Sequence, residues 1–193
     1  MSIVTLVSGG LDSTVMALLV HEEGIIQYPL FIDYGQINLE KELNACLNNF
    51  KRLGLPPPQI SRIGGYGNLL SSGLTDSNKR VFEDAFLPCR NLLFLTVGSA
   101  YAYQCGANSV AIGLLDEKYC LFPDQTVGFI KDAEALISKS LDYKINILTP
   151  LISFSKAEVC RIAINKGVNQ TYSCHTGSDK PCGLCISCRE YDN

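Results

Sequence analysis

Short apolar runs alternate with longer stretches of helical spacing along this chain. Residues 2–7 are apolar and rich in β-branched side chains, Ser8-Gly9-Gly10 interrupts them, and helical spacing continues from Ser13 to Glu23. The same alternation predicts strands at residues 28–34, 59–63, 109–114 and 146–148, and helices at residues 39–53, 91–104, 124–140 and 155–167. Ser155 and Glu158 form a capping box at the start of the last helix, and Gly167 ends it.

Strands that alternate with helices of this length predict an α/β fold, in which a doubly wound parallel sheet carries helices on both faces. Ligands of such sheets bind beyond the carboxyl ends of the strands. Two segments depart from the alternation: residues 64–88, which are rich in Gly, Ser, Asp and Asn, and the cysteine-rich tail, residues 171–193. We expect the first to be a mobile loop over the site, because a long segment without regular structure is usually functional or disordered.

The composition restricts the domain count and the class of partner. With 193 residues, of which 47% are hydrophobic and 18% charged, we expect one domain that includes the tail. The net charge of -3 and the absence of a Lys or Arg cluster disfavour nucleic acid and favour small molecules as partners. The apolar N-terminal run is too short to span a membrane and lacks a basic leader, so we expect a cytoplasmic protein without membrane contact.

Residues 8–14, Ser-Gly-Gly-Leu-Asp-Ser-Thr, follow the first predicted strand and open the first predicted helix. Their backbone N–H groups and hydroxyls surround the positive end of a helix dipole, where an anion is stabilised. The glycines allow the main chain to approach a ligand closely, and Asp12 can cap the helix or hold Mg²⁺. A Walker loop would end in Gly-Lys-Ser or Gly-Lys-Thr, and the missing Lys argues against γ-phosphoryl transfer. An ordinary glycine-rich turn with an Asp cap is the alternative.

Four cysteines lie close together near the end of the chain, in the pattern Cys174-x7-Cys182-x2-Cys185-x2-Cys188. Thiolates at this spacing can converge on one tetrahedral ion, for which zinc is the natural occupant. Because four protein ligands leave no open position, we expect a structural Zn²⁺ that ties the tail to the domain. A redox Cys-x-x-Cys pair and an iron–sulfur cluster are the alternatives. We expect the adjacent His175 to be a neighbour of the metal rather than a ligand.

Residues 8–14 resemble the PP-loop of the ATP-pyrophosphatase superfamily, whose adenine nucleotide alpha hydrolase-like domains bind ATP and transfer AMP to a substrate oxygen. The resemblance implies one PP-loop domain over residues 1–193, in which the loop neutralises the departing pyrophosphate. It also implies that the nucleotide is bound by the residues in and around the loop, namely Leu6, Val7, Ser8, Gly9, Gly10, Leu11, Asp12, Ser13, Thr14, Val15 and Met16.

Further motifs are similar in order and spacing to those of the QueC family of 7-cyano-7-deazaguanine synthases. They are Asp33-Tyr34-Gly35-Gln36, Pro88-Cys89-Arg90-Asn91, Pro123-Asp124, Thr149-Pro150-Leu151 followed by Lys156-Ala157-Glu158, and the segment from Ser173 to Cys188. The resemblance implies that ATP activates 7-carboxy-7-deazaguanine with release of AMP and pyrophosphate. Amidation by ammonia and dehydration would then give 7-cyano-7-deazaguanine (preQ0) for queuosine biosynthesis. ATP, Mg²⁺, structural Zn²⁺ and a homodimer are also implied.

The resemblance assigns roles to residues at matched positions. Arg90 would contact nucleotide phosphate or the acyl-adenylate, and it would act in catalysis with Asp12 and Ser13. Asp33 and Tyr34 would lie beside the nucleotide as cofactor-binding residues. An edge-capping Asp and a core Tyr are the alternatives for these two positions.

The substrate would be bound by Gln36, Asn91 and Asp124, with the Asp124 carboxylate reading donor N–H groups of the deazaguanine from the head of a helix. For Asn91 and Asp124 a simple helix cap is the alternative. The chain departs from the family where Ile37-Asn38 replaces an Arg-His pair. It departs again within residues 115–126, where Lys118 and Thr126 replace an acid and an Arg.

These departures leave more than one function open. The first is nitrile synthesis with ammonia, and the second is transfer of the activated acyl group to another amine of a protein or small molecule, ending at an amide. A non-catalytic nucleotide-binding module and a tRNA thiolase are further alternatives. The intact loop argues against the former, and the missing basic face argues against the latter.

Overall fold

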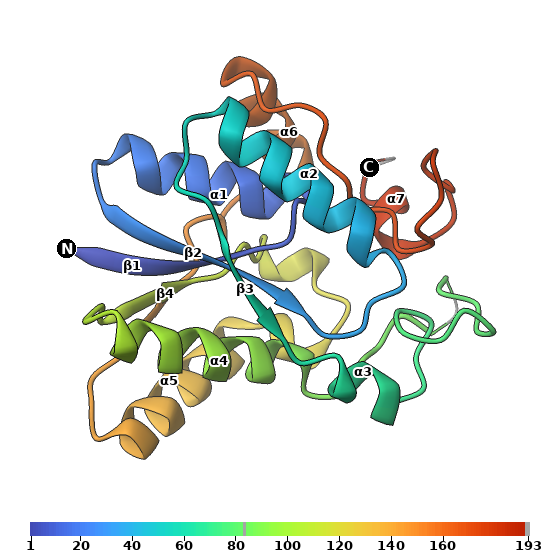
Figure 1. Cartoon of the computed structure of the whole chain (residues 1–193). Helices are drawn as coiled ribbons and strands as arrows, with labels where there is room; N and C mark the ends of the chain where they lie inside the picture. The colour runs from blue at the N-terminus through green and yellow to red at the C-terminus, as the bar shows by residue number, and fades with distance from the viewer. Residues whose placement is uncertain (83, 192–193) are drawn as a thin grey trace.

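The structure, a computed structural model, describes residues 1–82 and 84–191, which form a five-stranded parallel sheet in the order β3-β2-β1-β4-β5 (Figure 1). The strands are β1 (Ser2–Val7), β2 (Ile26–Asp33), β3 (Gln59–Arg62), β4 (Ser109–Ala111) and β5 (Asn146–Leu148). All four pairings between neighbouring strands are parallel. The predicted α/β class and parallel sheet are confirmed. The order reverses at β1, which places the carboxyl ends of β1, β2 and β4 around one crevice.

Helices cover both faces of the sheet, as the alternation of strands and helices predicts (Figure 1). One face carries α1 (Leu11–Glu22), α2 (Leu39–Arg52) and α6 (Lys156–Asn165), and the other carries α4 (Arg90–Gln104) and α5 (Val127–Leu141). Successive side chains of β1 point to opposite faces of the sheet. Ile3 and Val7 pack into the apolar cluster under α1 and α2, whereas Val4 and Leu6 pack into the cluster under α4 and α5.

The ends of several elements differ from the prediction. Helix α5 begins at Val127 instead of residue 124, because residues Pro123–Gln125 form a separate 3-10 turn, η2. The Gln125 side-chain oxygen accepts the N–H groups of Leu121 and Phe122, at 3.0 Å each, and thereby closes this turn before the Thr126 cap of α5. The remaining short helices are α3 (Gly65–Leu69), η1 (Glu117–Tyr119) and α7 (Ile186–Arg189). The capping box of α6 is confirmed, with Ser155 and Glu158 in reciprocal hydrogen bonds.

Residues 64–82 and 84–88, which the sequence predicts to be a mobile loop over the site, pack against the rest of the molecule. The segment contains α3, and it buries Leu74, Val81 and Leu87 in the core. A Cβ on Gly73 would lie 2.5 Å from the Val81 Cα, so the segment folds tightly upon itself. The sequence did not indicate this packing, because isolated apolar residues between polar ones can still share one core. Only the tertiary structure shows that they do. The mobility of the segment stays a prediction.

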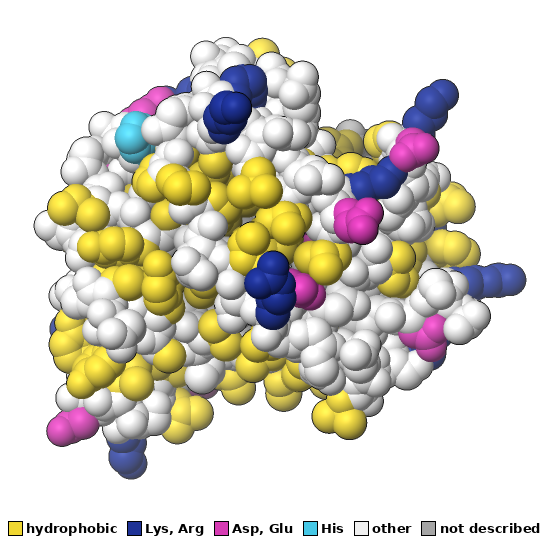
Figure 2. Space-filling model, in the orientation of Figure 1, with side chains coloured by type: hydrophobic (Ala, Val, Ile, Leu, Met, Phe, Trp, Pro, Cys, Tyr) yellow, Lys and Arg dark blue, Asp and Glu magenta, His cyan; other side chains and the backbone are white. Residues whose placement is uncertain are grey.

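In the described part of the chain, none of the helices combines the length and apolarity that crossing a bilayer requires. On the face seen in Figure 2, Lys and Arg side chains stand mostly apart among apolar and uncharged atoms. This face therefore offers no continuous basic stripe of the kind that tracks a phosphate backbone.

Candidate functional site

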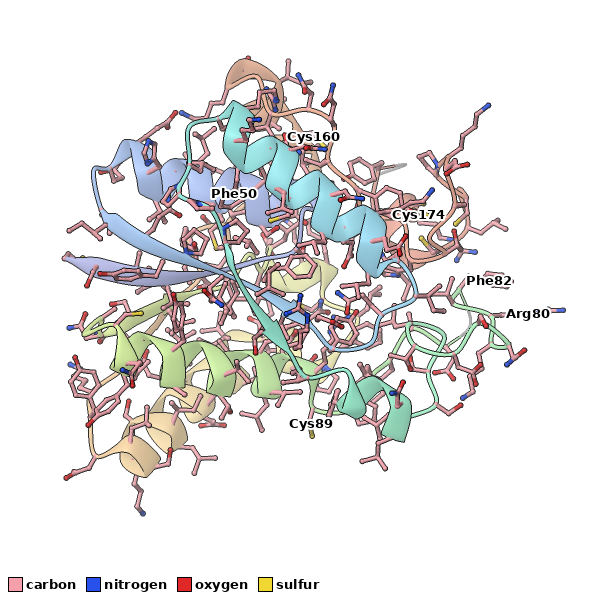
Figure 3. All side chains as sticks on the ribbon, viewed as in Figure 1. Phe50, Arg80, Phe82, Cys89, Cys160 and Cys174 are labelled. Carbon is pink, nitrogen blue, oxygen red and sulfur yellow. The ribbon has the colours of Figure 1, made fainter. Side chains whose placement is uncertain are left out.

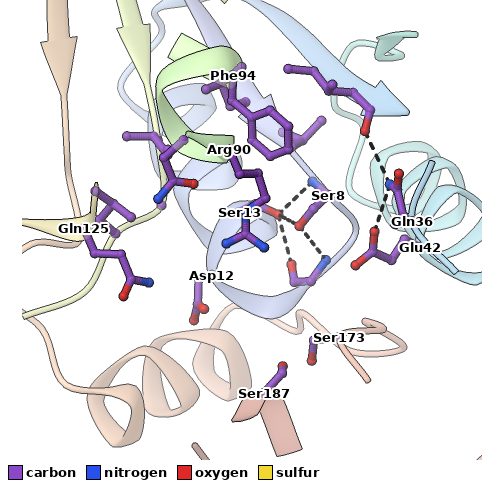
Figure 4. A pocket seen from close by; sticks show the side chains of 18 of the residues that line it. Ser8, Asp12, Ser13, Gln36, Glu42, Arg90, Phe94, Gln125, Ser173 and Ser187 are labelled. Carbon is purple, nitrogen blue, oxygen red and sulfur yellow. Dashed lines mark hydrogen bonds between the residues drawn. The ribbon is translucent and has the colours of Figure 1, made fainter. Parts of the chain in front are cut away.

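A cavity of about 260 Å³ lies at the carboxyl ends of β1, β2 and β4, where the sheet order reverses. Its floor is the loop between β1 and α1, and its walls come from the start of α4 and from the cysteine-rich tail (Figure 4). One part is polar, with Ser8, Ser13 and Ser187 in its lining. Another part is apolar and includes Leu6, Ile32 and Phe94. Such a cavity can accept a ligand with one anionic end and one aromatic end.

The loop at the floor of the cavity is held by its own hydroxyls. Ser13 Oγ accepts the Ser8 N–H at 3.1 Å and lies 3.1 Å from Ser8 Oγ, while Thr14 Oγ1 donates to the Gly10 carbonyl at 2.8 Å. Helix α1 begins at Leu11, directly after the loop, and its N-cap Gly10 makes no side-chain cap hydrogen bond. The positive end of the helix dipole thus lies at the loop, which suits an anion.

Gly9 allows the loop to pack closely on α2. Its φ of +80° is in the left-handed region, and a Cβ there would lie 2.2 Å from the Glu42 carbonyl oxygen and 2.8 Å from the Cys46 nitrogen. The glycine therefore lets the loop pack directly against α2. The expectation that both glycines also let the main chain approach a nucleotide stays a prediction.

The structure brings most, but not all, of the predicted nucleotide-binding residues to the cavity. Those that line it are Leu6, Val7, Ser8, Gly10, Leu11, Asp12, Ser13, Tyr34 and Arg90. Val15 and Met16 lie in the core instead, fully buried on the helix face that packs on the sheet, and Thr14 is buried within the first turn of α1. Helical periodicity turns these positions away from the loop, so their proximity to it in sequence does not bring them to the cavity lining.

Arg90 and Tyr34 meet across the cavity. The Arg90 side chain reaches from the first residue of α4 toward the loop (Figure 4), and the Tyr34 ring packs against Phe94 with centroids 5.3 Å apart. Burial raises the pKa of Tyr34 to about 12, although the nearby Arg90 opposes the shift. Asp33 is not in the cavity lining, because its carboxylate turns back to accept the Gly35 N–H at 3.1 Å. This matches the alternative of an edge-capping Asp.

Two of the three predicted substrate-binding residues line the cavity, but their polar groups are already engaged. Gln36 donates to the Ile32 carbonyl and to Glu42, and its oxygen accepts the Tyr34 N–H. Asn91 donates to the Asp124 carbonyl at 3.0 Å.

Asp124 does not line this cavity. Its carboxylate accepts the Asn91 backbone N–H at 3.2 Å and thereby caps α4 rather than its own helix.

A buried lysine that the sequence analysis did not select joins the loop to the tail. Lys156, the first residue of α6, donates to both carboxylate oxygens of Asp12 at 3.0 and 2.8 Å, and it pairs with Glu190 at 3.1 Å. Its ammonium also lies 4.8 Å from the centre of the Tyr191 ring. Although burial opposes it, the Asp12 carboxylate and the neighbouring Tyr191 and Glu190 raise the pKa of Lys156. The motif Lys156-Ala157-Glu158 was the one available signal in the sequence.

Glu42 is a second residue of the cavity that the sequence analysis missed. It lies in α2, and its carboxylate accepts Gln36 Nε2 at 3.2 Å and Asn38 Nδ2 at 3.0 Å. Burial raises the pKa of Glu42 to about 7, although these hydrogen bonds and Arg90 oppose the shift. Asn38 also donates to the Cys174 carbonyl at 3.0 Å and so connects α2 to the tail.

The four cysteines of the tail converge on one point. The sulfurs of Cys174, Cys182, Cys185 and Cys188 all lie within 4.8 Å of one another. Four thiolates around tetrahedral zinc stand about 3.8 Å apart, given Zn–S bonds of about 2.3 Å, so this donor set fits such an ion with small adjustments. Cys89 and Cys160 lie in other parts of the molecule (Figure 3). The predicted cysteine cluster is therefore present and can bind a metal.

The thiol environments also favour a cation. Burial opposes ionisation of Cys174, but hydrogen bonds from Thr176, Cys182 and Ser178 prevail and lower its pKa to about 6. Burial raises the pKa of Cys185 to about 12. Thiols in such close contact cannot all ionise without a positive ion among them, which a bound metal would supply.

The tail is a wall of the cavity as well as a candidate metal site. Ser173, His175, Ile186, Ser187 and Glu190 line the cavity, on both sides of the cysteines in sequence. Burial lowers the pKa of His175 to about 4, and the nearby Arg90 adds to the shift, so the ring is neutral at physiological pH. Holding the cysteines together therefore also shapes the candidate site.

A second cavity, of about 570 Å³, adjoins the first. The two share lining residues that include Asp12, Gly113, Gln125 and Glu190. The lining of the second cavity also includes Lys156 and, from the stretch that departs from the family pattern, Leu115, Asp116, Lys118, Tyr119, Cys120 and Leu121. Two ligands could thus meet beside Asp12.

Solved structures of other proteins share this fold. A tRNA thiolase, NcsA, from Methanococcus maripaludis has a TM-score of 0.60 at 20% identity, covering 99% of this chain and 63% of that chain. The NMN synthetase from Francisella tularensis has a TM-score of 0.58 at 16% identity, covering 96% of this chain and 68% of that chain. At such identities the likeness shows the fold alone.

Sequence relatives are closer. The 7-cyano-7-deazaguanine synthase of Acetivibrio thermocellus is 36% identical over 200 residues, which cover 96% of this chain and 88% of that protein. The enzyme of the same name from Campylobacter hominis is 32% identical over 203 residues, which cover 98% and 92% respectively. The family described as queuosine biosynthesis protein QueC matches residues 2–193. With a family match over nearly its whole length, the chain belongs to the QueC family.

Proposed function

We propose that this protein is an ATP-dependent carbon–nitrogen ligase that activates 7-carboxy-7-deazaguanine as its AMP ester, with release of pyrophosphate. Ammonia then gives the amide, and dehydration gives 7-cyano-7-deazaguanine. The single observation that carries the proposal is the hydroxyl-lined loop at the start of α1, which opens into a cavity shared with Arg90. Family membership and the names of the relatives support the choice of substrate.

In this proposal the phosphates of ATP occupy the polar part of the first cavity. The backbone N–H groups of the loop and the hydroxyls of Ser8 and Ser13 bind the pyrophosphate as it departs, and Arg90 neutralises charge on the transferred phosphate. The apolar part, near Ile32 and Phe94, accommodates the adenine ring. Asp12 binds Mg²⁺ while it also accepts the hydrogen bonds from Lys156, since each oxygen of a carboxylate can accept more than one partner.

The carboxylate substrate occupies the second cavity in this proposal. The two cavities share Asp12 and Gly113, so a carboxylate placed there is next to the α-phosphate of a nucleotide in the first cavity. The buried ammonium of Lys156 lies at this junction and orients Asp12. The tail holds Zn²⁺ through its four thiolates, where the ion stabilises the wall of the cavity and takes no part in the reaction.

A second candidate function is transfer of the activated acyl group to an amine larger than ammonia. The observation that favours it is the size of the second cavity, about 570 Å³, and its exposed apolar residues Tyr119 and Leu121. Small-molecule or protein amines are thus candidate acceptors, and nucleic acid is not proposed as a partner.

The test is incubation of the zinc-loaded protein with ATP, Mg²⁺, 7-carboxy-7-deazaguanine and either ammonium or a panel of amines. Mass spectrometry identifies the product, and chromatography separates AMP from ADP. We expect AMP and pyrophosphate with the wild type and at least a hundredfold less with Arg90→Ala, on the order of the loss of one transition-state donor. Arg161→Ala, an exposed arginine of α6, is the matched control. Formation of ADP, or equal rates in both variants, would refute the proposal.

A further inference from the structure

Glu42 is a carboxylate placed where the proposed mechanism collects negative charge. It lines the same cavity as the loop, and its helix packs on that loop, since a Cβ on Gly9 would lie 2.2 Å from the Glu42 carbonyl oxygen. Figure 4 shows its side chain directed into the cavity beside Gln36. An ionised carboxylate here would repel the phosphates of a bound nucleotide.

The surroundings of Glu42 allow it to carry a proton instead. Both of its hydrogen bonds come from neutral amides, Gln36 and Asn38, and within residues 1–82 and 84–191 it forms no ion pair. The charged or titratable groups that face it are Arg90 from α4, Tyr34 after β2, Cys46 from its own helix, and Tyr172 from the tail. Burial raises its pKa to about 7, so the proton is exchanged near neutral pH.

We propose that Glu42 is a catalytic residue that donates a proton to the departing pyrophosphate, an inference that rests on the proposed function. A substrate carboxylate oxygen forms a bond to the α-phosphorus, and the bond from that phosphorus to the bridging oxygen breaks. The bridging electrons remain on pyrophosphate, which takes the Glu42 proton and leaves Glu42 ionised. When ammonia later displaces AMP from the acyl group, the nitrogen releases a proton, and reprotonation of Glu42 from solvent closes the cycle.

The proposal has a consequence for nucleotide binding alone. Above pH 7 the free protein carries Glu42 mostly as the anion, and the charge of bound phosphates favours the protonated form. Binding of the non-reacting analogue α,β-methylene-ATP at pH 8 should therefore take up about one proton through Glu42. Calorimetry in buffers of different ionisation enthalpy measures this uptake. If Glu42 had a purely structural role, replacing it in a folded variant would leave the proton uptake unchanged.

The variants are Glu42→Gln, which cannot release a proton, and Glu42→Asp, which keeps one on a shorter side chain. Glu40→Gln, an exposed glutamate in the same helix turn, is the control. Circular dichroism and zinc content establish folding. We expect wild type, Glu40→Gln and Glu42→Asp to show the uptake and Glu42→Gln to lack it. Glu42→Gln should also form AMP about 100-fold more slowly or worse.

The outcomes separate this inference from the proposed function. Equal proton uptake by the wild type and Glu42→Gln, or equal rates of AMP formation, would overturn the role of Glu42 while leaving adenylation intact. Absence of AMP with the wild type would overturn both. Should Glu42→Gln fail to fold, two other measurements decide the inference. We expect proton uptake by the wild type and slower AMP formation by Glu42→Asp than by the wild type, and absence of either result would overturn it.

Discussion

Replacing Lys156 with Met tests whether the loop and the tail are held together by one buried cation. The Lys156 side chain is 9% exposed, while its partners Asp12 and Glu190 are 24% and 42% exposed. Removing one member of a fully buried ion pair costs about 3–5 kcal/mol. Because both acids retain contact with water, we expect a smaller loss, about 2 kcal/mol, with an accompanying fall in Tm of roughly 4–8 °C for a domain of this size.

Urea unfolding followed by circular dichroism, with zinc present throughout, measures this loss. The matched control is Lys166→Met, which removes the cation of the surface pair with Glu22 and should cost no more than about 0.5 kcal/mol. In a double-mutant cycle, Asp12→Asn and Lys156→Met should be less than additive by about 1 kcal/mol, because the Asn no longer needs a cation. A loss no larger than that of the control, or simple additivity, would refute the reasoning.

Three other predictions address the metal, the loop packing and the buried acid. Metal analysis should find about one zinc per chain. Cys182→Ser should lower the zinc content, the Tm and the affinity for ATP together, whereas Cys160→Ser should leave the zinc content unchanged. A wild-type protein that is folded without metal would contradict this prediction. Gly9→Ala should destabilise the fold by about 3 kcal/mol or more in urea unfolding, and Gly24→Ala, with φ +67° and open space, by about 1 kcal/mol; equal losses would disprove the packing argument. Because the folded pKa of Glu42, about 7, exceeds its ordinary value of 4.5, its stabilising contribution is complete below pH 4.5 and lost as pH rises through 7. The stability of Glu42→Gln relative to the wild type should therefore rise by about 3 kcal/mol between pH 4.5 and 8, and parallel stability curves would exclude the shift.

Most strands and helices of the fold can be predicted from the local periodicity of apolar residues. Each apolar run or helical spacing lies within a single element, so the element can be identified without its neighbours. This applies to β1, β2, β3 and β5 and to α1, α2, α4 and α6. The loop after β1 and the clustered cysteines are local as well. Element boundaries were harder to predict, as at α5, because a proline turn closed by Gln125 does not alter the apolar pattern. The packing of residues 64–88 was missed because its apolar residues are too far apart to show a period.

The composition of the candidate site was decided by tertiary structure. A glycine- and serine-rich loop after the first strand and a cluster of four cysteines can be identified from the sequence alone, because the residues of each motif lie close together in the chain. The sequence could not show that Lys156 meets Asp12, 144 residues away, or that Val15 and Met16 turn from the loop into the core. Contacts over such separations depend on how helices pack on the sheet. They leave no periodic signal in the chain, and only the folded arrangement brings the charges together.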